Sequence, residues 1–384
     1  MKKAKKIIAV LLVIIMTTVL FAACEGNTGG GGANSAAPSD SSSAAPSVTV
    51  APPPASSADS GAAQPPASGG AAVALGHGKD ITKDPIKIAL LTISTAGLCN
   101  RLYQMALEEQ AAIYPNVTFD YMDASFDPNK QITLIEEAVA QGYDAILIEP
   151  MDPVALNDAI DAAEKAGVIV VTFNIANPDA IHTLHVAGAD YPAGWEAGKI
   201  MSGMTGGEGT ALILDCPAVQ KPGARMGTGF EDYITQNTNI KLLEPAIGIE
   251  NWSADNAQIA MRDMLTKYGP GQISMVYCSS DDIANGAMNA IEQAGRQGDG
   301  ILVWGYMGYP YALEAVKAGK MAGTSFTDAY VQFASLFYIV MDHIALGLNS
   351  RTGNFSQTPA VEQPMIAVTK DNVDNIMAVS RWYS

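Results

Sequence analysis

Short apolar runs alternate with stretches of helical spacing along most of this chain, and after Asp190 the alternation begins again. Strand-like runs occur at 86–91, 117–121, 144–149, 168–173, 210–214, 242–249, 273–277 and 301–305. Continuous apolar strands separated by amphipathic helices indicate parallel sheets that helices cover on both faces. Because the series occurs twice, we predict an α/β fold of two Rossmann-like, doubly wound lobes.

The first 23 residues have the pattern of an export signal. Four lysines precede the uncharged apolar stretch 7–20, which is too short for a membrane span of about 20 residues. The stretch ends in Phe21-Ala22-Ala23-Cys24, which looks like a bacterial lipobox, although Phe21 stands where Leu is usual. We therefore predict cleavage before Cys24 and lipidation of its thiol; an ordinary signal peptide with an incidental cysteine is the alternative.

Residues 24–84 are almost wholly Gly, Ala, Ser and Pro. Such a segment lacks the apolar bulk to offset its conformational entropy, so we predict a disordered tether. A globular part that a tether joins to a lipid anchor predicts a protein on the extracytoplasmic face of a bacterial cell membrane. The length of the tether suits the thick cell wall of a Gram-positive cell better than a periplasm. A spacer between domains is the alternative interpretation.

Charge and cysteine content exclude some functions. The net charge is −17, and it becomes −21 once residues 1–23 with their four lysines are removed, which argues against nucleic-acid binding. Cys99, Cys216 and Cys278 cannot all pair with one another and lack metal-motif spacing, so we expect unpaired thiols and no metal site.

No cofactor fingerprint or catalytic motif is present, and we predict neither an enzyme nor a cofactor.

Polar and aromatic residues follow several of the predicted strands. They include Thr95, Asn174, Cys216, Trp252, Ser280 and Met307. Ligands of doubly wound sheets bind at the carboxyl ends of the strands, so these residues are candidates to line a cleft between the two lobes.

The chain resembles the type I periplasmic binding proteins of the ribose and galactose kind over about residues 86–368. Three segments carry the resemblance: 144–150 with 159–172 matches a strand, helix and strand of the family; 280–291 matches a helix start; and 303–306 matches a later strand. The resemblance implies three crossings between the lobes, near Gly188, near Asp328 and at 353–359. It therefore implies a first lobe of 85–188 plus 328–355 and a second lobe of 189–327 plus 356–384.

The resemblance also implies ligand-binding positions. Trp252 matches an aromatic that stacks on a sugar ring, and Arg225 matches an arginine for sugar hydroxyls, although its spacing to Gly229-Phe230 is one residue too long. Asp328 resembles a hinge aspartate, and Gln332 is a further polar candidate. We expect Asp281 to cap its helix.

Three departures from the ribose type bear on the ligand. Asn174-Ile175 replaces Asp-Arg, Ser280 replaces Asn, and Met307 replaces Asp. A neutral monosaccharide is favoured, while a deoxy sugar, a nucleoside or an autoinducer stays open. By resemblance the protein binds this ligand as a monomer and delivers it to the permease of an ABC importer. One alternative is a receptor that presents the ligand to a membrane sensor. Another is a transcriptional repressor of the same two-lobed fold, but it would need a basic helix-turn-helix before the first lobe, where this chain has the predicted signal and tether.

Overall fold

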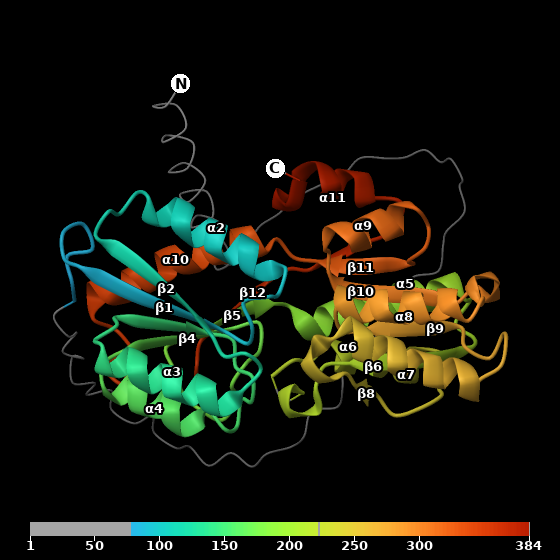
Figure 1. Ribbon diagram of the computed structural model, residues 1–384, viewed down its shortest axis with the longest axis horizontal. Coiled ribbons are helices and arrows are strands. Elements are labelled where there is room, and N and C mark those ends of the chain that lie inside the picture. Colours follow the sequence, from blue (N-terminus) through green and yellow to red (C-terminus); the bar gives the residue numbers. More distant parts are fainter. Residues whose placement is uncertain (1–77, 222, 384) are drawn as a thin grey trace, which may run out of the picture. The chain divides into compact units, whose positions relative to one another are not determined.

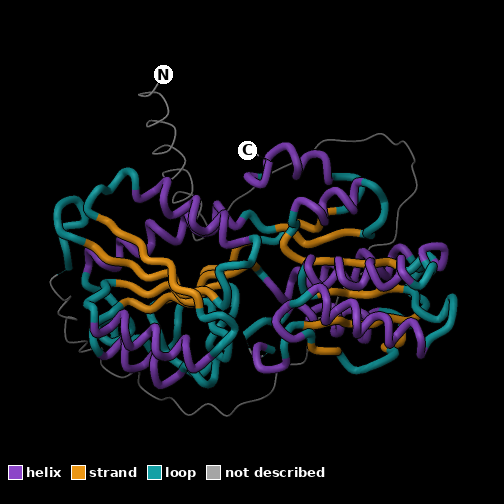
Figure 2. The backbone as a smooth tube through the Cα atoms, in the orientation of Figure 1, coloured by secondary structure: helices purple, strands orange, loops and turns teal. Residues whose placement is uncertain are grey.

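The computed structural model describes residues 78–221 and 223–383. The predicted signal peptide, Cys24 and the tether up to residue 77 lie outside the described residues. Two sheets organise the rest (Figures 1 and 2).

The first sheet has six parallel strands in the order β12-β5-β4-β3-β1-β2. Their bounds are β1 (Ile86–Thr92), β2 (Val117–Asp123), β3 (Ala145–Ile148), β4 (Ile169–Phe173), β5 (Leu184–Gly188) and β12 (Ala360–Gln363). β1, β3, β4 and β5 are buried almost throughout, as their apolar sequences require.

Helices cover both faces of this sheet (Figure 1). They are α2 (Cys99–Ala111) and α10 (Ala329–Leu346) on one face, and α3 (Pro128–Ala140) and α4 (Asn157–Lys165) on the other. α10 is long and apolar enough to cross a membrane by length and composition alone. Because Phe333, Leu336, Phe337 and Val340 are buried in the core beside β4 and β5, α10 is a core helix of this lobe.

The second sheet has the order β13-β11-β10-β9-β6-β7, with β8 paired to β6. Its strands are β6 (Thr210–Asp215), β7 (Lys241–Leu242), β8 (Ile247–Gly248), β9 (Met275–Cys278), β10 (Leu302–Met307), β11 (Gly323–Phe326) and β13 (Ile366–Val368). All pairs are parallel except β11 with β13. The single strand predicted at 242–249 is wrong: it is two short strands, because Pro245 lies between them and has no backbone N–H for a ladder.

Six helices pack on the second sheet. α5 (Asp190–Met204) and α6 (Met226–Asn237) share one core with it, and α7 (Ala254–Lys267), α8 (Asp281–Gln293), α9 (Pro310–Lys317) and α11 (Val373–Val379) share the other. The predicted two-lobe, doubly wound α/β fold is thereby confirmed.

Polar residues at strand ends start the helices that follow. Ser253 Oγ accepts from Asn256 N at the start of α7, and Ser280 Oγ accepts from Ile283 N at the start of α8. The expectation that Asp281 is this cap is wrong. Asp281 is fully buried, and its carboxylate accepts from Tyr309 N at 2.6 Å and Thr324 Oγ1 at 2.7 Å, which ties α8 to the second sheet.

The chain passes between the lobes three times. The first passage lies at Ala189 between β5 and α5, and the second lies between β11 and α10, where Asp328 caps α10. The third lies at 364–365, later than the expected 353–359, because β12 pairs with β5 in the first sheet. Residues 360–363 thus belong to the first sheet, not to the second lobe.

The C-terminal end contacts both lobes. Arg381 pairs with Glu109 of α2 at 3.1 Å, while the ring of Trp382 packs edge-on against Tyr309 of the second lobe at 5.6 Å.

Candidate ligand-binding site

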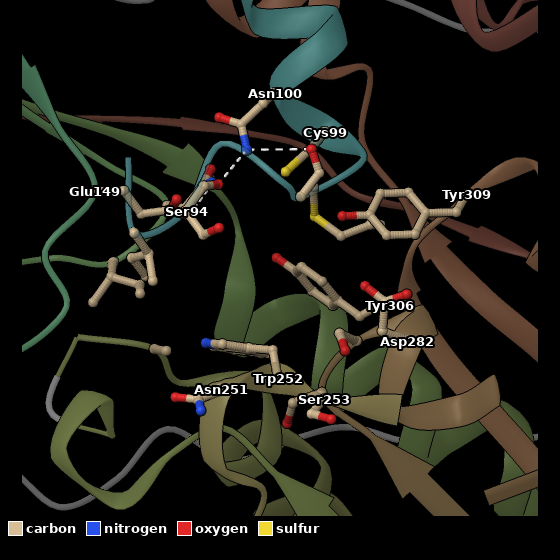
Figure 3. A pocket seen from close by; sticks show the side chains of 18 of the residues that line it. Ser94, Cys99, Asn100, Glu149, Asn251, Trp252, Ser253, Asp282, Tyr306 and Tyr309 are labelled. Atoms are coloured by element: carbon tan, nitrogen blue, oxygen red, sulfur yellow. Dashed lines mark hydrogen bonds between the residues drawn. The ribbon is translucent and has the colours of Figure 1, made fainter. Parts of the chain in front are cut away.

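A cavity of about 330 Å³ is lined by residues of both lobes (Figure 3). Its volume falls within the range of small-molecule sites, about 300–1,000 Å³. The polar and aromatic side chains that line it are Ser94, Asn100, Tyr103, Phe126, Glu149, Asn174, Asp190, Asn251, Trp252, Ser253, Ser279, Ser280, Asp282, Tyr306, Tyr309 and Thr327.

The cavity lies at the carboxyl ends of the strands. Glu149 and Asn174 follow β3 and β4 of the first sheet, whereas Ser280 follows β9 and Met307 ends β10 of the second. Parallel strands bring their carboxyl ends to one edge of a sheet, so two such edges supply the walls.

A hydrogen-bonded set forms the wall of the first lobe. Asn174 Nδ2 donates to Glu149 Oε1 and to Tyr103 Oη, both at 2.8 Å. Asn174 has a φ of 56°, a left-handed conformation that asparagine tolerates better than most residues. Burial raises the pKa of Glu149 to about 7, although the bond from Asn174 acts in the opposite direction.

Two further carboxyl groups belong to the second lobe. Asp282 accepts from Tyr311 Oη at 2.7 Å, and burial raises its pKa. Asp190 accepts from Tyr306 Oη, and burial raises its pKa to about 7. In Figure 3 Tyr306, Tyr309 and Asp282 lie on the opposite side of the open space from Glu149 and Ser94.

Trp252 borders the cavity from the short turn η3 (Glu250–Trp252). Its indole Nε1 donates to Gln220 Oε1 at 2.7 Å. The ring is half-buried and packs against apolar cores of the second lobe.

The charges of the cavity have one sign. Three carboxyl groups line it, and none of the described lining residues is Lys, Arg or His. Carboxylate, amide and hydroxyl groups can accept from and donate to a hydroxylated ligand, but the cavity offers an anion no charged donor.

The structure brings four of the predicted site residues to the cavity: Asn174, Trp252, Ser280 and Met307. Gln332 lies behind Asn174, because its Nε2 contacts Asn174 Oδ1 at 3.5 Å and Val186 O at 3.3 Å.

Arg225, Thr95 and Asp328 are not among the residues that line the cavity. Arg225 is exposed, with its guanidinium 5.1 Å from the ring centre of Tyr191. Thr95 is exposed and donates to Asp123 at 3.1 Å. Asp328 accepts from Tyr330 N and Val331 N as the cap of α10.

Several lining residues were not predicted. Glu149 carried a usable signal, since it is a charged residue directly after a buried apolar strand. Asn100 and Tyr103 carried none, because on the first turns of α2 they read as ordinary residues of an amphipathic helix.

The three described cysteines are unpaired. Cys216 and Cys278 are buried, whereas Cys99 is half-buried and lines the cavity. Within residues 78–221 and 223–383, no three His, Cys, Asp or Glu side chains come together as a possible metal site.

Two parallel-sheet lobes with a polar and aromatic cavity at their strand ends define a ligand-binding protein of the two-lobed class. A family model described as a periplasmic binding protein domain matches residues 99–348. The chain belongs to this family.

Two curated relatives are binding proteins. The xylitol-binding protein of Mycolicibacterium smegmatis is 30% identical over 259 residues, which are 67% of this chain and 70% of that protein. The ribose import binding protein of Bacillus subtilis is 30% identical over 212 residues, 53% of this chain and 64% of that protein. The family and both relatives are binding proteins, as predicted, and not enzymes.

Solved structures share the fold. An ABC transporter solute binding protein from Bacillus halodurans with bound myo-inositol matches with a TM-score of 0.66 and 25% identity, over 77% of this chain and 99% of that chain. A galactofuranose binding protein matches with a TM-score of 0.67 and 18% identity, over 77% and 98%.

Proposed function

We propose that this protein is the lipid-anchored substrate-binding component of an ABC importer and that it binds an uncharged sugar or polyol between its lobes. The observation that carries the proposal is the cavity at the strand ends of both lobes, in which hydroxyl, amide and carboxyl groups surround an aromatic ring. Polyhydroxylated ligands need such a mixture of donors, acceptors and apolar surface.

Trp252 supplies the apolar surface in this proposal. An indole face suits the C–H side of a sugar ring or polyol chain, while Asn174, Ser280 and Glu149 are positioned to bond hydroxyl groups. Met307 would contact a less polar part of the ligand.

The charge of the cavity narrows the ligand class. An anionic ligand would meet three carboxyl groups without a compensating cation among the described lining residues, so uronic acids and sugar phosphates should bind poorly. Xylitol, ribose and myo-inositol, which the names of two relatives and one neighbour contain, are uncharged polyhydroxyl compounds.

Other observations support the predicted membrane anchor and the permease as a partner. Cys24 follows small residues after an apolar stretch, as a lipidation site would. One relative is named an import binding protein and one neighbour an ABC transporter solute binding protein. Delivery to a permease follows as the simplest role for this chain.

A thermal-shift screen of the mature chain carrying Cys24→Ser tests the proposal. The screen contains xylitol, ribose, myo-inositol, other neutral sugars, nucleosides, and glucuronate as the anionic counterpart of glucose. A ligand that binds only the folded state raises the melting temperature with concentration. We expect at least one neutral polyol or sugar to do so and glucuronate to have no effect.

Variants locate the ligand. Trp252→Ala should weaken binding at least tenfold, and Trp252→Phe should weaken it less. Trp195→Ala is the control, because Trp195 packs on Tyr191 and Tyr233 and does not line the cavity. Failure of every neutral sugar and polyol to shift the melting temperature would refute the proposal.

A further inference from the structure

Trp252 is held in an unusual backbone conformation. Its φ is 53° and that of Asn251 is 58°, so two consecutive residues that are not glycine lie in the left-handed region. A residue as bulky as tryptophan is strained in this region and persists there only where its surroundings hold it. The contacts of the Trp252 side chain are therefore part of what fixes its position.

The side-chain amide of Gln220 makes one hydrogen bond through its oxygen and another through its nitrogen. It ends the 3₁₀ helix η2 (Ala218–Gln220) of the second lobe and is 1% exposed. Its Oε1 accepts from Trp252 Nε1 at 2.7 Å, and its Nε2 donates to Met151 O at 3.1 Å. Met151 belongs to the first lobe, directly after the segment that carries Glu149. One buried amide thus joins the tryptophan of one lobe to the backbone of the other.

The backbone at Gly223, three residues after Gln220, also lies directly against the first lobe. Ala176 N donates to Gly223 O at 3.3 Å. A Cβ added at Gly223 would lie 2.1 Å from Ala176 O, and the three atoms nearest to it belong to Ile175 and Ala176 of the first lobe. Only glycine fits this approach.

The amide chemistry requires both partners at once. A glutamine side chain accepts through its oxygen and donates through its nitrogen, so it can satisfy an indole N–H and a carbonyl simultaneously. If the lobes separate, Met151 moves away from Gln220, and water replaces the Met151 carbonyl as the partner of the amide nitrogen. The orientation of the amide, and with it the acceptor for Trp252, is then no longer fixed.

We propose that Gln220 is a positioning residue that makes the orientation of Trp252 depend on the contact between the two lobes. The ligand then meets a fixed indole face only when the lobes are together. The proposal rests on the proposed function insofar as Trp252 contacts the ligand.

Hydrogen exchange of the Trp252 indole N–H tests this coupling without a ligand. The experiment uses ¹⁵N-labelled mature chain with Cys24→Ser, and the resonance is identified by its loss in Trp252→Phe. In Gln220→Met both bonds are lost, and exchange should become at least tenfold faster.

Gly223→Val separates positioning from a local structural role. It leaves Gln220 and Trp252 in place but forces the first lobe away, so the exchange of the Trp252 indole should accelerate several-fold. Gln258→Met is the control, because half-buried Gln258 donates at the protein surface to Gln293 of the same lobe. Wild-type exchange in Gly223→Val or in Gln220→Met, with the melting temperature retained, would overturn the proposal.

Binding of xylitol, ribose and myo-inositol supplies a second readout. Gln220→Met should weaken whichever of them binds about tenfold, mainly through faster dissociation, and unchanged affinity would count against the proposal. If none binds the wild type, the proposed function loses its support, while the exchange experiment still decides the role of Gln220.

Discussion

The Asn174 amide donates to the Glu149 carboxyl group at 2.8 Å at the edge of the cavity. Burial nevertheless raises the pKa of Glu149 to about 7, so this group is about half protonated at neutral pH. An ionised carboxylate accepts stronger hydrogen bonds from ligand hydroxyls than a protonated one does. We therefore expect affinity for a neutral ligand to rise between pH 6 and pH 8, measured by isothermal titration calorimetry.

Glu149→Gln provides the comparison. It should weaken binding about tenfold at pH 8, the loss expected for a bond to a charged group, and should reduce the pH dependence. Part of the dependence should remain, because burial also raises the pKa of Asp190 to about 7. An identical pH profile in Glu149→Gln would show that Glu149 does not bind the ligand.

Cys99 reports on occupancy of the cavity. Burial raises the pKa of its thiol to about 11, so alkylation by iodoacetamide should be slow and should accelerate toward pH 9. A bound ligand should slow it several-fold further, as measured by peptide mass spectrometry. Cys216 and Cys278 are 0% exposed and should react only after unfolding. A ligand that raises the melting temperature without protecting Cys99 would have to bind elsewhere.

Two buried histidines predict sensitivity to acid. Thr172 Oγ1 lies 2.8 Å from both His182 Nε2 and His185 Nδ1, and burial lowers the pKa of each histidine to about 4. Between pH 6.5 and pH 4 the unfolded chain binds more protons at these sites than the folded one, so stability falls as the pH falls. We expect a loss of about 1–2 kcal/mol for each histidine between pH 7 and pH 5, seen as a lower urea midpoint.

A variant isolates this contribution from other titrating groups. His185→Asn should be less stable at pH 7, because Thr172 loses a partner, but its stability should change less between pH 7 and pH 5. An unchanged difference between the two pH values would contradict the assignment.

Glu164 joins segments that are distant in the sequence. Its carboxylate accepts from Val170 N, from the backbone and hydroxyl of Thr183, and from those of Ser350, at 2.7–3.0 Å. Glu164→Ala leaves these buried donors without a partner and should lower the free energy of unfolding by about 3 kcal/mol, measured by urea denaturation. Glu137→Ala on the exposed face of α3 is the control and should change it by less than about 0.5 kcal/mol.

Most of the fold could be predicted because its signal is local. Apolar runs such as 86–91 and 168–173 become strands that are buried almost throughout, and the restart after Asp190 marks the second lobe. β12 was not predicted, because its sequence, Ala360–Gln363, is half polar and its partner β5 lies more than 170 residues earlier in the chain. Nothing local indicates such a pairing.

The site was predictable only in part. Residues directly after strands, such as Asn174 and Ser280, could be placed because the strand fixes where they lie. Arg225 shows the limit: it was assigned from the resemblance, yet its side chain lies outward over Tyr191, a direction that spacing along the chain does not determine. The start of α8 shows the same limit for two adjacent residues. The sequence indicates a polar cap there, but it does not distinguish Ser280, which caps the helix, from Asp281, which does not.

The pairing of β12 with β5 also governs the order in which the molecule can be completed. A chain emerging from the ribosome or an export channel delivers its N-terminal part first, yet the outer edge of the first sheet stays uncovered until residues 360–363 have emerged. All strands of the second lobe except β13 are made before that moment. An uncovered strand edge is a template for wrong pairing. The first lobe is therefore completed only when nearly the last part of the protein has been delivered.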